Sequence, residues 1–221
     1  PLRWRTGVDK SKLNLAAVCC KTRVLGPGER AVIWIQGCPF RCPGCISPAW
    51  LPFVQAEVHE PKLLAQQLLA DSEITGITIS GGEPVTQSTA LLTFLDHCHN
   101  IRDIDVIMFT GYYYENLLAF PLNSPVQRLI KLIDVLIDGP YIAAENDNRG
   151  LRGSSNQRII HLSHKLRDYD FINIQRQTEI HISNGVVFLK GVPPKGVLPG
   201  VMASIEKSLD VTSPGGTYER A

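Results

Sequence analysis

The chain has 221 residues, of which 44% are hydrophobic and 19% charged, and its formal net charge is +1. Such a composition is typical of a globular protein with a buried core, and the near-zero charge gives no electrostatic reason to expect nucleic acid as a partner. No apolar run is long enough to span a membrane, and the six cysteines are too few for a disulfide framework, so we expect a protein of the reducing cytoplasm with no membrane partner.

The first 23 residues show no clear periodicity, and we interpret the adjacent Cys19 and Cys20 as ordinary buried thiols. A Gly-Pro-Gly turn at 26–28 then precedes the apolar run at 31–35, which predicts a buried first strand. Ligands of α/β sheets bind at the carboxyl ends of the strands. We therefore expect this strand to deliver the residues that follow it to a functional edge of the sheet.

The loop after this strand carries three closely spaced cysteines, Cys38, Cys42 and Cys45, in the pattern C-x3-C-x2-C. Thiolates are strong ligands for iron, and closely spaced cysteines on a loop hold iron–sulfur clusters. Three ligands for a four-iron cluster leave one iron open, which indicates chemistry rather than a structural role. Phe40 would shield the iron from water. A zinc knuckle and three unrelated thiols remain open as alternatives, although no further pair of ligands at zinc spacing follows.

The elements that follow the cysteines alternate in type. They are a helix opening at Pro61, a strand over 74–80, a helix over 88–97, a strand over 105–109, a helical stretch to about Leu132 and a strand over 134–138. Strands that alternate with helical segments indicate a parallel sheet with right-handed crossovers. The predicted fold class is therefore α/β, with the parallel sheet closing into a partial (β/α) barrel.

The sequence changes character from about residue 168. Two β-rich runs, 178–182 and 186–190, flank Asn184-Gly185, which is the strongest short signal for a β-hairpin. The tail beyond them is rich in proline and glycine, and we expect it to be frayed at its end. We predict two units, a core over residues 1–167 with an N-terminal extension, and a C-terminal appendage over 168–221 that contains the hairpin.

Unusual residues follow the predicted strands and should meet on one rim of the sheet. Gly81-Gly82-Glu83-Pro84 follows the second strand, where glycines let the backbone approach a ligand and a carboxylate can hold an ammonium group. Alone, such a stretch usually means only a tight turn. Thr110-Gly111 ends the third strand and Asp138 ends the fourth, although Asp138 could equally cap a helix.

The cysteine spacing together with the G-G-E-P element resembles the radical S-adenosylmethionine enzymes. The resemblance implies two cofactors, a 4Fe-4S cluster on the three cysteines and S-adenosyl-L-methionine (SAM) on its open iron. It also implies that an electron from the cluster cleaves SAM to a 5′-deoxyadenosyl radical, which abstracts hydrogen. The residues implied in binding the cofactors are Phe40, Gly81, Gly82, Glu83, Thr110, Gly111, Asp138, Arg152, Ser154 and Asn156.

A narrower resemblance is to the activating enzymes of the anaerobic, class III ribonucleotide reductases. It covers roughly residues 24–162 and rests above all on residues 152–157, whose sequence R-G-S-S-N-Q matches an element of that family. It implies an enzyme that abstracts the α-hydrogen of one glycine in a partner glycyl radical enzyme. Flavodoxin or ferredoxin is the implied electron donor.

Two features depart from that family. Pro140 stands where its members commonly have a lysine able to pair with the SAM carboxylate, and Arg152 or Arg158 are candidates to replace it. The chain also continues well beyond the R-G-S-S-N-Q element, so the added hairpin could shape a different substrate site. A radical maturase of a ribosomal peptide or a small molecule is therefore an alternative, and a non-catalytic zinc-binding adaptor is a more distant one.

Overall fold

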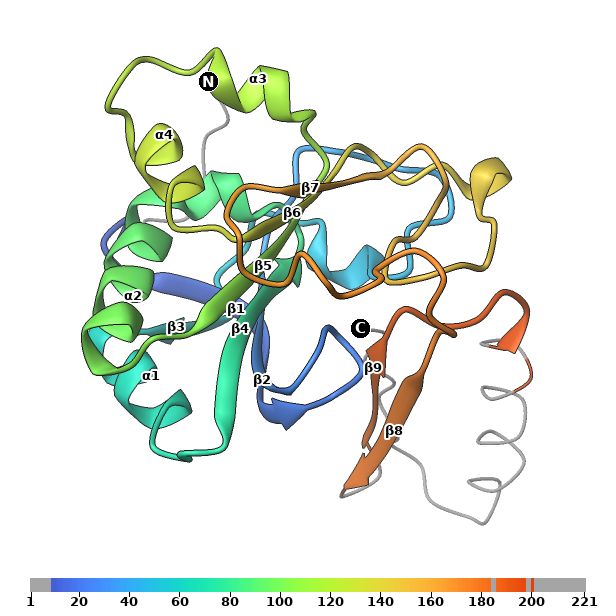
Figure 1. Ribbon diagram of the computed structural model, residues 1–221, viewed down its shortest axis with the longest axis horizontal. Helices are drawn as coiled ribbons and strands as arrows, with labels where there is room; N and C mark the ends of the chain where they lie inside the picture. Colours follow the sequence, from blue (N-terminus) through green and yellow to red (C-terminus); the bar gives the residue numbers. More distant parts are fainter. Residues whose placement is uncertain (1–8, 184–185, 198–199, 201–221) are drawn as a thin grey trace.

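One large sheet and one hairpin organise the computed structural model, which describes residues 9–183, 186–197 and 200 (Figure 1). Within the described residues, seven strands of the large sheet lie in the order β3-β1-β2-β4-β5-β6-β7. These strands are β1 (Leu13–Thr22), β2 (Glu29–Ile35), β3 (Glu57–His59), β4 (Ile74–Gly81), β5 (Asp105–Thr110), β6 (Val135–Asp138) and β7 (Arg158–His161).

The middle of the sheet is parallel, as the alternation of strands and helices predicts. Four strands are parallel to one another: β2 pairs with β4, β4 with β5, and β5 with β6. Antiparallel strands lie on both flanks, with β1 and β3 beyond β2, and β7 beyond β6. The mixed α/β class is confirmed, and the carboxyl ends of the four parallel strands share one edge.

Strand β1 is an element that the sequence does not predict. It pairs with β2 through two register shifts, one between Leu15 and Ala17 and one between Cys19 and Thr22. Such irregularities insert extra residues and interrupt the two-residue alternation by which a strand is recognised. The prediction of two buried thiols is wrong for one of them, because Cys19 is buried and Cys20 is exposed.

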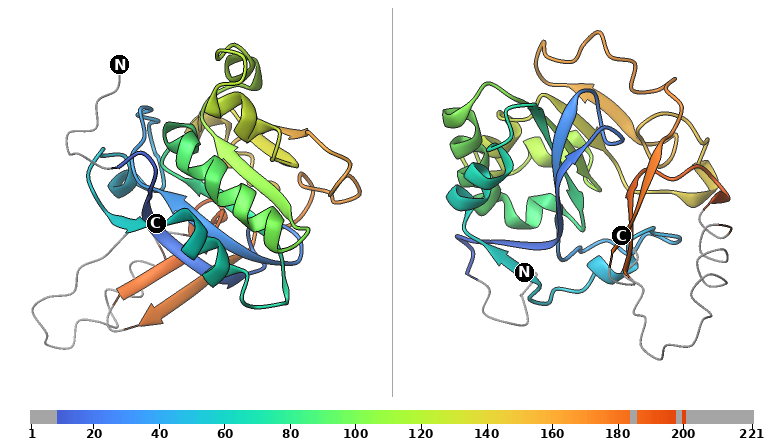
Figure 2. Two further views of the ribbon diagram at one scale, coloured as in Figure 1. Left: turned by 90° about the vertical axis from the view of Figure 1, so that its left-hand side faces the viewer. Right: turned by 90° about the horizontal axis from the view of Figure 1, so that it is seen from below.

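Helices cover one face of the sheet, as Figures 1 and 2 show. They are α1 (Pro61–Leu68), α2 (Ser88–Ile101), α3 (Tyr114–Leu118) and α4 (Pro125–Ile130), with short 3-10 turns η1 (Pro48–Trp50), η2 (Pro84–Gln87) and η3 (Ala143–Glu145). Helices α1 and α4 both begin with proline, which fits the first helical turn because its missing N–H has no partner there. Leu64, Leu91 and Phe94 are buried between helices and sheet. In the described part of the chain, no helix is long and apolar enough to cross a membrane.

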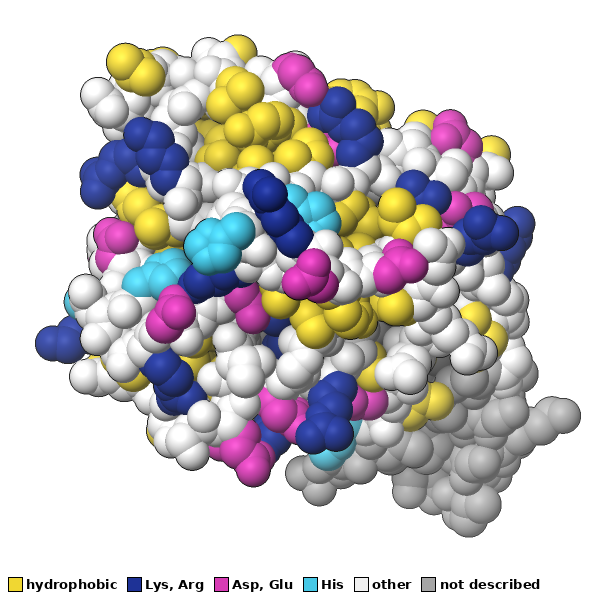
Figure 3. All heavy atoms as spheres, in the orientation of Figure 1, with side chains coloured by type: hydrophobic (Ala, Val, Ile, Leu, Met, Phe, Trp, Pro, Cys, Tyr) yellow, Lys and Arg dark blue, Asp and Glu magenta, His cyan; other side chains and the backbone are white. Residues whose placement is uncertain are grey.

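The opposite face of the sheet is covered by loops and by the hairpin of β8 (Thr178–Ser183) and β9 (Val186–Gly191) (Figure 2). The Phe188 ring lies edge-on to Trp34 with the ring centroids 5.3 Å apart. The pairing of β8 with β9 confirms the predicted hairpin. The Asn184-Gly185 turn and most of the tail lie outside the described residues. On the face drawn in Figure 3, positive and negative side chains are interspersed, in keeping with the net charge of +1.

A buried arginine fixes the amino ends of the central strands. Arg30 in β2 is 0% exposed and donates to the Thr78 hydroxyl (2.7 Å) and to the Asp105 carboxylate (2.5 Å). Gly76 makes room for it, since a Cβ there would lie 2.5 Å from the guanidinium. This ion pair links β2, β4 and β5 at the end opposite to the cysteines.

Candidate functional site

A cavity of about 820 Å³ lies at the carboxyl ends of the parallel strands, within the size range of ~300–1,000 Å³ typical of small-molecule sites. Its described lining comes from the cysteine loop and the turn after it (residues 38–51), the ends of β4 (80–83) and β5 (109–111), the segment after β6 (139–157) and the C-terminal part (176 and 189–196). The structure therefore brings the cysteines together with two of the predicted strand-end elements, those after β4 and at the end of β5.

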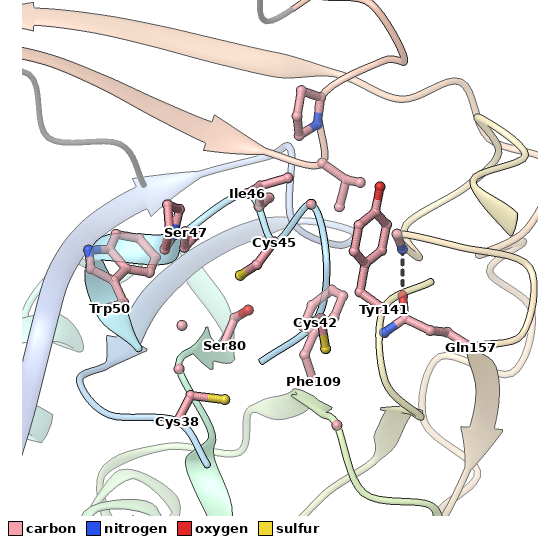
Figure 4. Close-up of a pocket in the computed structure, with 18 of the residues that line it drawn as sticks. Cys38, Cys42, Cys45, Ile46, Ser47, Trp50, Ser80, Phe109, Tyr141 and Gln157 are labelled. Atoms are coloured by element: carbon pink, nitrogen blue, oxygen red, sulfur yellow. Dashed lines mark hydrogen bonds between the residues drawn. The ribbon is translucent and has the colours of Figure 1, made fainter. Parts of the chain in front are cut away.

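The three cysteines face the same space from different points of the loop (Figure 4). Cys38 is 7% exposed, whereas Cys42 and Cys45 are half-buried, and all three line the cavity. Burial raises the pKa of the Cys38 thiol to about 12 and also raises the pKa of Cys45. Burial thus favours the thiol form of both residues over the thiolate, and metal binding requires release of these protons.

The loop itself is shaped by its glycines and by its anchors. Gly37 and Gly44 have φ values of 95° and 76°, which favour glycine because other residues carry a Cβ that clashes there. The N–H groups of Gly37 and Cys38 donate to the carbonyls of Trp50 (2.8 Å) and Leu51 (3.0 Å). The loop is thus closed at its base, and its cysteines project into the cavity.

The three thiols are a donor set of the kind that holds an iron–sulfur cluster. Among the described residues, no group of three or more His, Cys, Asp or Glu side chains is placed to hold one metal ion. In a cluster of several irons each thiolate binds a different iron, so its ligands stand further apart than those of one zinc ion. Cys38, Cys42 and Cys45 all line the one cavity, which is the arrangement that such a cluster requires.

The double glycine after β4 packs directly against the start of the cysteine loop. A Cβ on Gly81 would lie 2.2 Å from the Ile35 nitrogen, and a Cβ on Gly82 would lie 2.3 Å from the Gly37 carbonyl oxygen. The N–H of Gly82 donates to the Ile35 carbonyl (2.7 Å) and the N–H of Glu83 to that of Gly37 (2.9 Å). The glycines therefore permit a close backbone contact that sets the position of the cysteines.

Glu83 is buried and bonded within the protein. It is 1% exposed, and its carboxylate accepts from the Gly111 N–H (2.8 Å), the Val85 N–H (3.0 Å) and the Thr110 hydroxyl (2.8 Å). Burial raises its pKa to about 7, against the opposing effect of these three hydrogen bonds. The carboxylate thus joins the end of β4 to the end of β5.

Phe40 lies over the end of β5 and lines the cavity. A Cβ on Gly111 would lie 2.7 Å from the Phe40 ring, so glycine is needed for this contact. The same ring packs edge-on against Tyr112 at a centroid distance of 4.9 Å. The aromatic side chain is therefore fixed beside the cysteines.

Asp138 lies outside the cavity lining. It is 0% exposed, accepts from the Tyr114 N–H at the start of α3 (2.7 Å), and pairs with Arg158 at 2.5 Å. Arg158 also pairs with Glu115 (2.7 Å), and the two carboxylates raise the pKa of its guanidinium. Asp138, at the end of β6, thus accepts a hydrogen bond from the first turn of α3, a helix that comes before β6 along the chain.

Three further predicted residues, Arg152, Ser154 and Asn156, also lie outside the described lining. Arg152 pairs with Asp147 at 2.6 Å. The Ser154 hydroxyl accepts from the Ile142 N–H (3.1 Å), and the Asn156 amide donates to the Pro140 carbonyl (2.7 Å). These contacts hold the segment after β6 in shape.

The same segment places residues in the cavity that the sequence does not single out. Tyr141 and Gln157 line it, and Gln157 accepts from the Gly153 N–H at 2.8 Å (Figure 4). Gln157 belongs to the R-G-S-S-N-Q element, which could have pointed to it. Arg176 and Lys195 come from the C-terminal part and line the cavity as well, and no local pattern in the sequence marks either of them.

Similar proteins share the part of the chain that carries the cysteine loop. Residues 24–160 match the family described as "4Fe-4S single cluster domain". The anaerobic ribonucleoside-triphosphate reductase-activating protein of Salmonella typhi is 32% identical over 151 residues, covering 63% of this chain and 92% of that protein. Its namesake in Escherichia coli strain K12 is 30% identical over 160 residues, again covering 63% and 92%. The pyruvate formate-lyase-activating enzyme of Listeria monocytogenes is 30% identical over 149 residues, covering 65% of this chain and 59% of that enzyme.

Proposed function

Because the chain belongs to the radical SAM enzymes with a single 4Fe-4S cluster, we propose that it activates a glycyl radical enzyme, of which the anaerobic ribonucleotide reductase is the first candidate. A 4Fe-4S cluster and SAM are its cofactors. The observation that carries the proposal is one cavity that unites three thiols, the double glycine after β4 and the end of β5. Its volume of about 820 Å³ is sufficient for a cluster and a nucleotide-sized ligand.

Cys38, Cys42 and Cys45 would hold the cluster and leave one iron for SAM. When bound, these cofactors would supply one-electron cleavage of the sulfonium, the chemistry needed to remove a hydrogen atom from a glycine α-carbon of the partner. The electron donor is a flavodoxin or ferredoxin under this proposal. The cytoplasm, where such donors and reduced thiols occur, is the proposed location.

The end of β4 would receive the methionine part of SAM. The backbone of Gly81 and Gly82 comes close to the cavity because neither residue carries a side chain. One Glu83 oxygen accepts from both Val85 and Thr110, while the other accepts only from the Gly111 N–H. A carboxylate oxygen can accept two hydrogen bonds, so this second oxygen can also receive the ammonium group of SAM.

Apolar side chains would protect the radical. Trp34, Trp50, Phe109 and Leu189 line the cavity together with Phe40. Exclusion of water from such a site prevents side reactions of a reactive intermediate. Phe40, fixed by its contacts with Gly111 and Tyr112, would shield the cluster and its open iron from solvent.

The remaining predicted residues would have a structural role, because their side chains bond within the protein. Asp138, Arg152, Ser154 and Asn156 hold the segment after β6, which brings Tyr141 to the cavity. We propose that strands β2, β4, β5 and β6 form the partial barrel of the family. We also propose that residues 1–167 are the catalytic core and 168–221 an appendage.

The test is anaerobic reconstitution with iron and sulfide, followed by a strong reductant and SAM. We expect a brown protein that releases 5′-deoxyadenosine and, with a glycyl radical partner, a glycine-centred doublet in electron paramagnetic resonance. Cys42→Ala should lose iron and activity, whereas Cys20→Ala, which changes an exposed thiol away from the cavity, should keep both.

Three results would redirect the proposal. A wild-type protein that binds zinc, stays colourless and has no affinity for SAM would be the adaptor. Release of 5′-deoxyadenosine without a glycyl radical on any partner would favour a peptide or small-molecule maturase, which the added hairpin wall supports. Full iron content in Cys42→Ala would remove the cysteine loop from the mechanism.

A further inference from the structure

Arg176 is a buried arginine that has no carboxylate partner among the residues that the structure describes. It is 6% exposed and lines the cavity. Its hydrogen-bond acceptors are all uncharged, namely the Asn146 amide oxygen (2.9 Å) and the carbonyls of Arg152 (2.6 Å), Gly153 (3.2 Å) and Pro193 (3.4 Å). Its Nε is buried and, within the described structure, has no hydrogen-bond partner.

An arginine in this position keeps its charge and needs a counter-charge. A guanidinium does not lose its proton in proteins, and a buried charge without an opposite charge is unfavourable. Burial lowers the pKa of Arg176, and Asp147 acts against this effect from a distance. Asp147 is itself the ion-pair partner of Arg152. Within the described residues, no carboxylate forms an ion pair with Arg176, so an anionic ligand in the cavity would supply its counter-charge.

Lys195 is the second cation at the same wall. It is exposed and lines the cavity, and its backbone N–H donates to the Asn148 side chain (2.7 Å). No described carboxylate pairs with its ammonium group. In the described lining of the cavity, the positively charged side chains are those of Arg176 and Lys195. Both residues lie beyond the family-matched residues 24–160.

The two arginines of the core that could bind the SAM carboxylate, Arg152 and Arg158, already form ion pairs within the protein. Arg152 pairs with Asp147, and Arg158 pairs with Asp138 and Glu115. Neither arginine lines the cavity within the described part of the structure. The family-matched core therefore contributes no free cation to the described wall, although SAM carries a carboxylate.

The wall is continuous from the cysteine loop to Arg176. A Cβ on Gly44 would lie 3.8 Å from the Tyr141 ring, and a Cβ on Gly153 would lie 3.0 Å from the same ring. The Gly153 carbonyl accepts from Arg176. The guanidinium of Arg176 is thus linked to the cysteine loop through Gly153 and Tyr141.

We infer that Arg176 and Lys195 form a carboxylate subsite that the C-terminal part adds to the cavity, and that it binds the methionine carboxylate of SAM. The inference rests on the proposed function. Arg176 supplies positive charge within the wall, and Lys195 reaches the ligand from the rim. The segments on either side of the added hairpin then complete the cofactor site, in addition to any contact with the partner enzyme.

The experiment compares SAM with decarboxylated SAM, which lacks only the carboxylate. Anaerobic competition dialysis on the cluster-loaded full chain gives both affinities for the wild type, Arg176→Gln and Lys195→Ala. The control is Lys190→Ala, which removes a lysine of the hairpin between Arg176 and Lys195; Lys190 pairs with Glu179 (3.7 Å) outside the lining.

We expect Arg176→Gln to weaken SAM binding about ten- to hundredfold, the range for loss of a charge-assisted interaction, and Lys195→Ala to weaken it about threefold. Binding of decarboxylated SAM should change less than twofold in both variants, and the control should bind both ligands as the wild type does. Comparison of the two ligands separates a lost carboxylate contact from a general loosening of the wall by the Arg176 substitution.

Unchanged SAM affinity in both variants, or an equal loss for the two ligands, overturns the inference. In either case SAM binding by the wild type would leave the proposed function intact. A wild-type protein that carries its cluster but does not bind SAM would instead refute the proposed function.

Discussion

Glu83 offers a sharp test of how the site is built, because its carboxylate is engaged before any ligand arrives. Glu83→Ala would leave the buried Val85 N–H, the partly buried Gly111 N–H and the Thr110 hydroxyl without their acceptor. An unsatisfied buried donor costs about 1–3 kcal/mol, and the hydroxyl can turn elsewhere, so the two N–H groups set a cost of about 2–6 kcal/mol. Loss of the buried carboxyl recovers part of its desolvation, which places the expected destabilisation near the lower limit, about 2–3 kcal/mol.

The assay is urea unfolding of the reduced apoprotein, without iron or SAM. The matched control is Glu57→Ala, because the Glu57 side chain is 70% exposed and its ion pair is with His59, so its removal should cost less than about 1 kcal/mol. Equal stability of the two variants would refute the view that Glu83 joins β4 to β5. Its role would then lie in ligand binding alone.

Further predictions concern packing and charge. Asp105→Asn should lower the free energy of unfolding by about 3 kcal/mol, because Arg30 is 0% exposed and would lose its counter-charge, and a loss under about 1 kcal/mol in urea would contradict this. Gly82→Ala places a Cβ 2.3 Å from the Gly37 carbonyl oxygen and should displace the cysteine loop. The iron content per chain of the reconstituted variant should fall by more than about half. Full iron loading of the variant would show that this contact does not position the cysteines. Burial raises the pKa of Glu83 from 4.5 to about 7, so the folded apoprotein binds this proton more tightly than the unfolded chain, and stability should fall by about 3 kcal/mol as the pH rises through that window. Glu83→Gln should remove this slope in unfolding titrations from pH 4 to 8, and an unchanged slope would assign the titration to another group.

Local sequence signals account for the parallel core and the hairpin. The strand at 74–80 has a regular apolar pattern and glycines after it, and the structure places it as β4 beside the cysteine strand. Strand β1 escapes prediction because its two register shifts break the alternation over residues 13–22. The periodicity of a sequence reports regular pairing, and an irregular strand leaves no such signal.

Side-chain partners are harder to predict than strands. Glycine at 81 and 82 suggests close approach of the backbone, but the sequence does not say that part of this approach is to Ile35 and Gly37. The bonds of Glu83 to the end of β5 span 27 and 28 residues and exist only once the parallel sheet has formed. The sequence could thus identify the residue types at the rim, while the three-dimensional fold decides which of them face the ligand.

The arginines of the segment after β6 show why a matching motif does not fix a role. Arg158 could serve a ligand only by leaving Asp138, which is 0% exposed and would then remain as a buried unpaired charge. The loss of one partner from a buried pair costs about 3–5 kcal/mol, more than a single charge-assisted contact to a ligand returns. Arg176 faces no such conflict, because its acceptors are uncharged, so that a shift of its guanidinium toward an anion would leave no buried carboxylate unpaired. The cation best able to meet a ligand carboxylate is therefore the one outside the family motif.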